Sequence, residues 1–147
     1  MGLLDKAASV FSGGASAGLT LTPNNPRLHR GEEVGFSYAI RPKSSFNCRG
    51  VRVELQSVET SSASVGTGSG SRDGTEVSII HQSKTELMGE STFTENVAKD
   101  GTGKILIPAD VQPTYNGKNA SHVWKLRLVV DIAMGVDLKE IVELTVL

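Results

Sequence analysis

The sequence predicts an all-β protein, an antiparallel sandwich of two sheets with a short N-terminal amphipathic helix. Three observations support this class. Apolar and polar residues alternate in about eight short stretches, glycine is frequent (16 of 147 residues), and no helical pattern separates the stretches. A chain of this length buries a core without metals or disulfides. We therefore expect one sandwich domain over residues 19–147, preceded by a helix and a small-residue hinge over residues 1–18.

The first residues predict the amphipathic helix. Leu3, Leu4 and Phe11 share one face with Ala7 and Ala8. A helix this short is not stable alone in water, so its apolar stripe requires a cover: its own domain, another copy of the chain, or a membrane surface. We expect Leu3, Leu4 and Phe11 to be docking residues, and peripheral membrane contact through this helix stays open.

Small residues follow the helix and indicate a hinge. The run 14–18 also matches the nucleophile-elbow pattern around Ser16. That chemistry needs a strand before the serine and a helix after it, whereas here the predicted order is reversed. We interpret the match as chance.

The clearest strand is His122–Ile132, in which Trp124 and every second residue after it are apolar. We expect it to be the central strand of the core. Residues 61–74 have almost no apolar content and predict a long mobile loop. The other predicted strands, in chain order, are Leu19–Leu21, Val34–Ile40, Val51–Gln56, Val77–Gln82, Ser91–Val97, Gly103–Pro108 and Ile141–Val146.

The charge balance argues against nucleic acid as a partner. The formal net charge is -1, which gives no field that attracts polyanions. A local basic bias contains Arg27, Arg30, Arg49 and Arg52, which we predict as a polar contact patch. Such a patch suits an anionic ligand or a phosphorylated peptide, but the lack of interleaved aromatic residues favours a solvated strand edge.

No metal or cofactor site is expected. His29, His81 and His122 fall on different predicted elements without carboxylates at ligand spacing. Asp131 and Asp137 flank a predicted hairpin, which is weak support for a calcium ion.

The single cysteine, Cys48, is expected to be a small buried hydrophobic residue rather than a nucleophile. We expect a reducing, cytoplasmic setting, because the sequence has a single cysteine and shows neither a signal-peptide pattern nor an apolar run long enough to span a membrane. We do not expect an enzyme.

Several motifs in this order resemble one lobe of the arrestin-like sandwich family, including its bacterial sporulation-control type. They are the turn Gly31–Val34, the run Gly50–Leu55 after Cys48, the strand at Phe93, the segments Lys104–Pro108 and Pro113–Gly117, and the strand that begins at Trp124. The resemblance implies an immunoglobulin-like sandwich that acts as an adaptor or scaffold without chemistry of its own.

Family members usually have two such lobes, whereas the resemblance here covers one, over residues 19–147. A single lobe exposes the surface that meets the second lobe, so we expect a protein partner or other copies of the chain. The first hypothesis is an adaptor that binds partners through sheet edges and loops. The alternative is a self-assembling subunit of a ring, fibre, sheath or shell.

Overall fold

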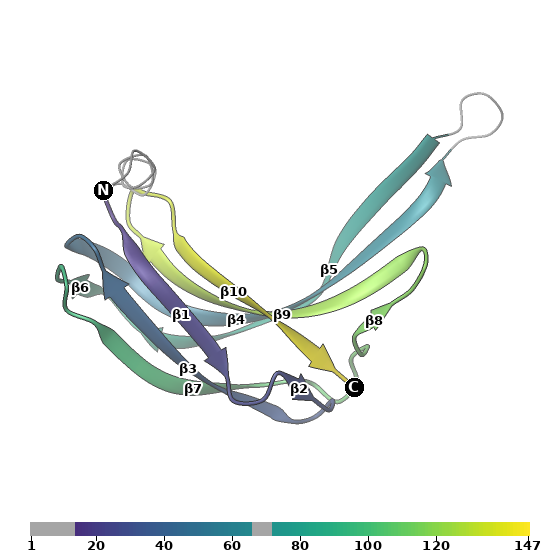
Figure 1. Cartoon of the computed structure of the whole chain (residues 1–147), viewed down its shortest axis with the longest axis horizontal. Helices are drawn as coiled ribbons and strands as arrows, with labels where there is room; N and C mark the ends of the chain where they lie inside the picture. The colour runs from purple at the N-terminus through teal and green to yellow at the C-terminus, as the bar shows by residue number, and fades with distance from the viewer. Residues whose placement is uncertain (1–13, 66–71) are drawn as a thin grey trace.

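A computed structural model describes residues 14–65 and 72–147 and places them in two packed β-sheets (Figure 1). The predicted docking residues Leu3, Leu4 and Phe11 lie outside the described residues. In the described part of the chain, no helix is long and apolar enough to span a membrane. The all-β, two-sheet prediction is confirmed.

The smaller sheet has three strands in the order β1-β3-β7, and both pairings are antiparallel. Its strands are β1 (Ala17–Pro23), β3 (Glu33–Pro42) and β7 (Lys99–Leu106).

The larger sheet has the strand order β2-β10-β9-β4-β5, with β6 beside β4 and β8 beside β9. One of its pairings is parallel, namely that of β2 with the last residues of β10. The two-residue strands β2 and β8 were not predicted. The strands are β2 (Arg27–Leu28), β4 (Phe46–Val65), β5 (Arg72–Met88), β6 (Ser91–Phe93), β8 (Tyr115–Asn116), β9 (Ala120–Ile132) and β10 (Leu138–Val146).

The prediction that His122–Ile132 forms the central strand is confirmed, because β9 lies between β10 and β4. The alternate residues from Trp124 to Ile132 are all buried, with at most 3% of their surface exposed. They belong to the same core cluster as Phe36 and Ile40 of β3. The Trp124 indole Nε1 donates to the carbonyl of Gln112 at 2.9 Å, so the polar atom of the largest core residue is satisfied.

The prediction of a mobile loop over residues 61–74 was wrong at both ends of that range. β4 and β5 continue their antiparallel pairing as far as Val65 and Arg72. The backbone hydrogen bonds of a hairpin do not need apolar side chains, and serine and threonine are tolerated where both faces meet water. In Figure 1 this hairpin extends beyond the rest of the sandwich.

β1 begins at Ala17, two residues before the predicted sandwich boundary. Ser16 is anchored just before it, since its backbone N–H donates to Ser44 Oγ (3.0 Å) and its carbonyl accepts from the Lys43 N–H (2.8 Å). A strand therefore follows Ser16, as the sequence indicated.

Candidate interaction surfaces

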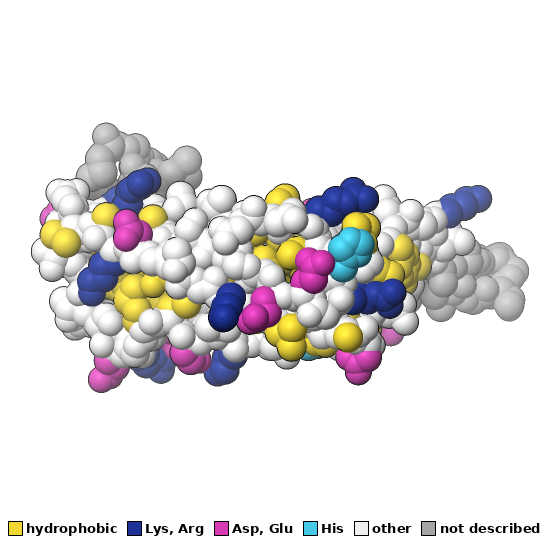
Figure 2. Space-filling view, turned by 90° about the horizontal axis from the view of Figure 1, so that it is seen from below, with side chains coloured by type: hydrophobic (Ala, Val, Ile, Leu, Met, Phe, Trp, Pro, Cys, Tyr) yellow, Lys and Arg dark blue, Asp and Glu magenta, His cyan; other side chains and the backbone are white. Residues whose placement is uncertain are grey.

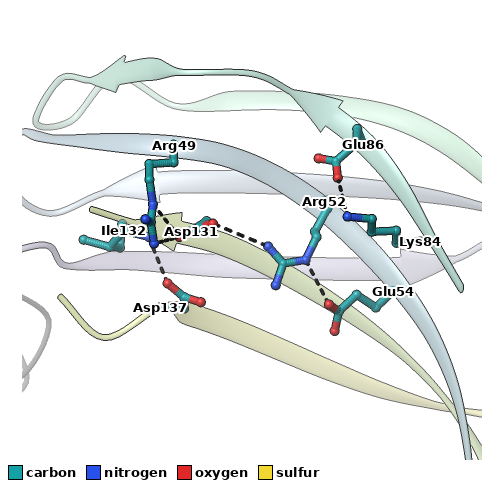
Figure 3. A network of polar contacts seen from close by, with 8 residues as sticks. All are labelled: Arg49, Arg52, Glu54, Lys84, Glu86, Asp131, Ile132 and Asp137. Carbon is teal, nitrogen blue, oxygen red and sulfur yellow. Dashed lines mark hydrogen bonds and ion pairs between the residues drawn. The ribbon is translucent and has the colours of Figure 1, made fainter. Parts of the chain in front are cut away.

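The structure brings together two of the four predicted basic residues. Arg49 and Arg52 both contact Asp131, with Arg49 Nη2 2.9 Å from Oδ1 and Arg52 Nη1 3.8 Å from Oδ2. Figure 3 shows the two guanidinium groups on either side of this carboxylate. Asp137 lies close by, and its Oδ1 accepts a hydrogen bond from the Ile132 N–H at 3.0 Å.

The other two residues lie elsewhere. Arg27 belongs to β2 and pairs with Thr145, near the end of β10, whereas Arg49 and Arg52 lie on β4. Arg30 Nη1 donates to the carbonyl of Val111 at 3.2 Å. Arg27 and Arg30 thus lie apart from Arg49 and Arg52, because closeness along the chain does not place residues on the same part of a sheet.

Glu54 is the centre of the ion-pair network on the outer face of the larger sheet. Its Oε2 accepts from Arg52 Nε at 2.9 Å, and its Oε1 lies 3.4 Å from Arg127 Nη1. The hydrogen bond to Glu54 raises the pKa of the Arg52 guanidinium. Only 6% of Glu54 is exposed. Arg52 and Arg127 are therefore both engaged by one carboxylate.

Cys48 is buried, as expected, with 3% of its surface exposed. Burial raises the pKa of its thiol, so little of the reactive thiolate forms near neutral pH. We predict that Ellman's reagent modifies Cys48 at pH 8 at least about a hundredfold more slowly in the native protein than in urea-unfolded protein. Equal rates in the two states would contradict this burial.

The histidines lie apart from carboxylate clusters. His122 is buried, and its Nδ1 lies 2.9 Å from the carbonyl of Pro113. The His81 ring packs against Trp124, with 5.6 Å between ring centres. In residues 14–65 and 72–147, no three histidine, cysteine or acidic side chains are grouped as metal ligands.

One open edge of the larger sheet is formed by β5, the last strand in its order. The C-terminal half of β5 is covered by β7: Thr85 Oγ1 lies 3.4 Å from the carbonyl of Lys104, and Leu87 lies against Gly103. The N-terminal half, residues 74–80, extends with β4 as an arm (Figure 1), which we define as residues 58–62 of β4 with 74–80 of β5.

The arm exposes three large apolar side chains. Val77, Ile79 and Ile80 are 63%, 57% and 53% exposed. Figure 2, seen from below, shows hydrophobic side chains at the surface towards this end of the molecule. An edge strand presents free backbone donors and acceptors, so a row of apolar residues beside it is a template for another strand.

The pairing of β5 with β4 is interrupted where the arm begins. Ser57 pairs with His81 and Val58 with Ile79, so Ile80 has no opposite residue on β4. A bulge of this kind bends a strand and often protects an edge. From Ile79 to Arg72 the pairing is regular, so the exposed part of the edge has the geometry for strand addition.

The sequence predicted a strand at Val77–Gln82 but not its exposure. In the sequence, the adjacent apolar residues Ile79 and Ile80 interrupt the period of two, and this interruption is the signal from which the bulge could have been predicted.

No protein-family model matches this sequence, and no curated protein matches it. Among solved structures, it is similar to the crystal structure of Spo0M, a sporulation control protein from Bacillus subtilis, with a TM-score of 0.66 and 17% identity. The match covers 89% of this chain and 49% of the Spo0M chain, so this chain spans about half the length of that structure. The predicted resemblance to the arrestin-like, sporulation-control type is confirmed at the level of the fold.

Proposed function

We propose that this protein is a non-enzymatic interaction module that binds a partner protein by adding a strand of the partner to the β5 edge. The observation that carries the proposal is the pair Val77 and Ile79, two exposed apolar residues on the same side of the regularly paired part of this edge strand. Added strands gain affinity from backbone hydrogen bonds and specificity from alternate side chains.

The polar outer face of the larger sheet is a less suitable binding surface than the β5 edge. The outer-face arginines Arg52 and Arg127 both contact Glu54, so each of these guanidinium groups already has a carboxylate partner. The Bacillus subtilis protein of similar fold is a sporulation control protein. A control role agrees with an interaction module rather than with catalysis.

A self-assembling subunit is the second candidate, and the same edge supports it. Two copies related by a two-fold axis would place one β5 antiparallel to the other. Light scattering separates the two candidates, because only self-assembly raises the mass of the purified chain with concentration.

We predict that the double substitution Val77→Lys/Ile79→Lys weakens partner binding at least about tenfold, because lysines on an edge strand oppose pairing. The measurement is quantitative recovery of the partner from the native cells after affinity purification. The same lysines would reduce the mass of a self-assembled species.

The matched control is Val136→Lys/Ile141→Lys, since these residues are 57% and 50% exposed but lie off the arm. Both variants should stay folded, because exposed substitutions cost little stability. Equal partner recovery with both double variants would contradict the edge proposal.

A further inference from the structure

On the regularly paired part of the β5 edge, the outer side is apolar. Val77 and Ile79 lie two residues apart, so both side chains point to the same side of the strand. Their partners on β4 are Thr60 and Val58, which lie an even number of residues from Glu54 and so share its outer face. A strand added to this edge therefore meets apolar side chains at two alternate positions.

The inner side of the same segment, opposite the outer face, is acidic. Glu76 and Ser78 alternate with the two apolar residues and therefore point to this side. Ser78 pairs with Glu59 of β4, which places the Glu59 side chain there as well. The Tyr115 hydroxyl donates to Glu59 Oε2 at 3.2 Å. Among the side chains that the structure describes, no lysine or arginine forms an ion pair with Glu59 or Glu76.

The position opposite Ser78 on an added strand lies within reach of both carboxylates. Neighbouring strands are about 4.8 Å apart, so this position is about 10 Å from Glu59, measured between the backbones. Ser78 is small, and a long side chain can extend over it towards Glu59. Glu76 is the diagonal neighbour of the same position, and opposite charges at such positions stabilise strand pairs.

We propose that the strand added to β5 has the alternating sequence apolar–basic–apolar. Its apolar residues lie opposite Val77 and Ile79, and its lysine or arginine lies opposite Ser78. There the cation is shared by the carboxylates of Glu59 and Glu76. All of these positions precede the bulge at the root of the arm, where the pairing of β5 is regular. The inference rests on the proposed function and gives the chemistry of the partner.

A second copy of β5 fits this pattern poorly. In the antiparallel register that sets Val77 opposite Ile79, each Ser78 lies opposite the same serine of the other copy. This register supplies no cation next to Glu76. The acidic inner side therefore favours a strand from a different protein.

The test titrates the full chain with two fluorescent seven-residue peptides that are blocked at both ends. Their central sequence is Val-Lys-Val or Val-Glu-Val, between two threonines on either side. At low ionic strength, we expect fluorescence anisotropy to show that the lysine peptide binds at least about fivefold more tightly than the glutamate peptide. Glu59→Gln/Glu76→Gln should bring the two affinities within about twofold of each other.

The matched control is Glu90→Gln/Glu95→Gln, which removes the same charge from exposed positions outside the arm and should keep the preference for lysine. In Glu59→Gln, the new amide oxygen still accepts a hydrogen bond from Tyr115, so the arm should stay folded.

Equal affinities of the two peptides for the wild type, or an unchanged preference in Glu59→Gln/Glu76→Gln, would overturn the inference. If the peptides bind equally and Val77→Lys/Ile79→Lys abolishes their binding, the basic residue is rejected and the edge proposal stands. If neither peptide binds, the inference is also overturned, and recovery of the native partner decides the edge proposal separately.

Discussion

Trp124→Ala is expected to lower the free energy of unfolding by about 3–5 kcal/mol. Trp124 is completely buried in the central strand, and its rings pack near His81 and His122. Truncation leaves a cavity in the core and removes the donor to the Gln112 carbonyl. Urea unfolding followed by circular dichroism measures the change.

Trp124→Phe is the control for this prediction. It keeps most of the apolar contact and loses the indole N–H, so its cost should be about 1–3 kcal/mol, mainly from the unpaired carbonyl of Gln112. A free energy of unfolding for Trp124→Ala within about 1 kcal/mol of the wild-type value would show that β9 is not central to the stability of the core.

Glu54→Leu is expected to lower the free energy of unfolding by about 2–3 kcal/mol. The substitution leaves two guanidinium groups without their shared carboxylate. Breaking a fully buried pair costs about 3–5 kcal/mol, and the smaller figure applies because the side chains of Arg52 and Arg127 are 23% and 19% exposed.

Glu86→Leu is the matched control, because Glu86 pairs with Lys84 on the same sheet but its side chain is 61% exposed. Its cost should stay within about 0.5 kcal/mol. Similar losses in the two variants, measured by urea unfolding, would mean that the Glu54 network adds nothing beyond an ordinary surface pair.

The sandwich could be predicted because its core strands carry a pattern with a period of two. Every second residue from Trp124 to Ile132 and from Val34 to Ile40 is apolar and buried, and burial of one face of a strand produces this period of two. The two-residue strands β2 and β8 are too short to carry such a pattern.

The outer end of the arm could not be predicted, because Ser62, Thr75 and Glu76 are exposed and polar and so leave no apolar pattern. Residues 61–74 resemble a loop in composition, yet Ser61 pairs with Glu76 and Ser62 with Thr75 through the backbone. Backbone pairing does not require particular residue types, so the sequence predicts too early an end for β4 and too late a start for β5.

The candidate sites were only partly accessible from the sequence. The grouping of Arg27 with Arg49 failed because the fold separates β2 from this part of β4.

The most direct test of the strand-addition account is site-specific photo-cross-linking in the native cells, with the photoreactive residue at position 79 or, as the control, at position 136. The account predicts a discrete adduct from position 79, with cross-linked partner or chain residues in one contiguous segment, and no such adduct from position 136. Absence of an adduct at position 79, or the same adduct from both positions, would contradict the claim that the β5 edge is the binding surface.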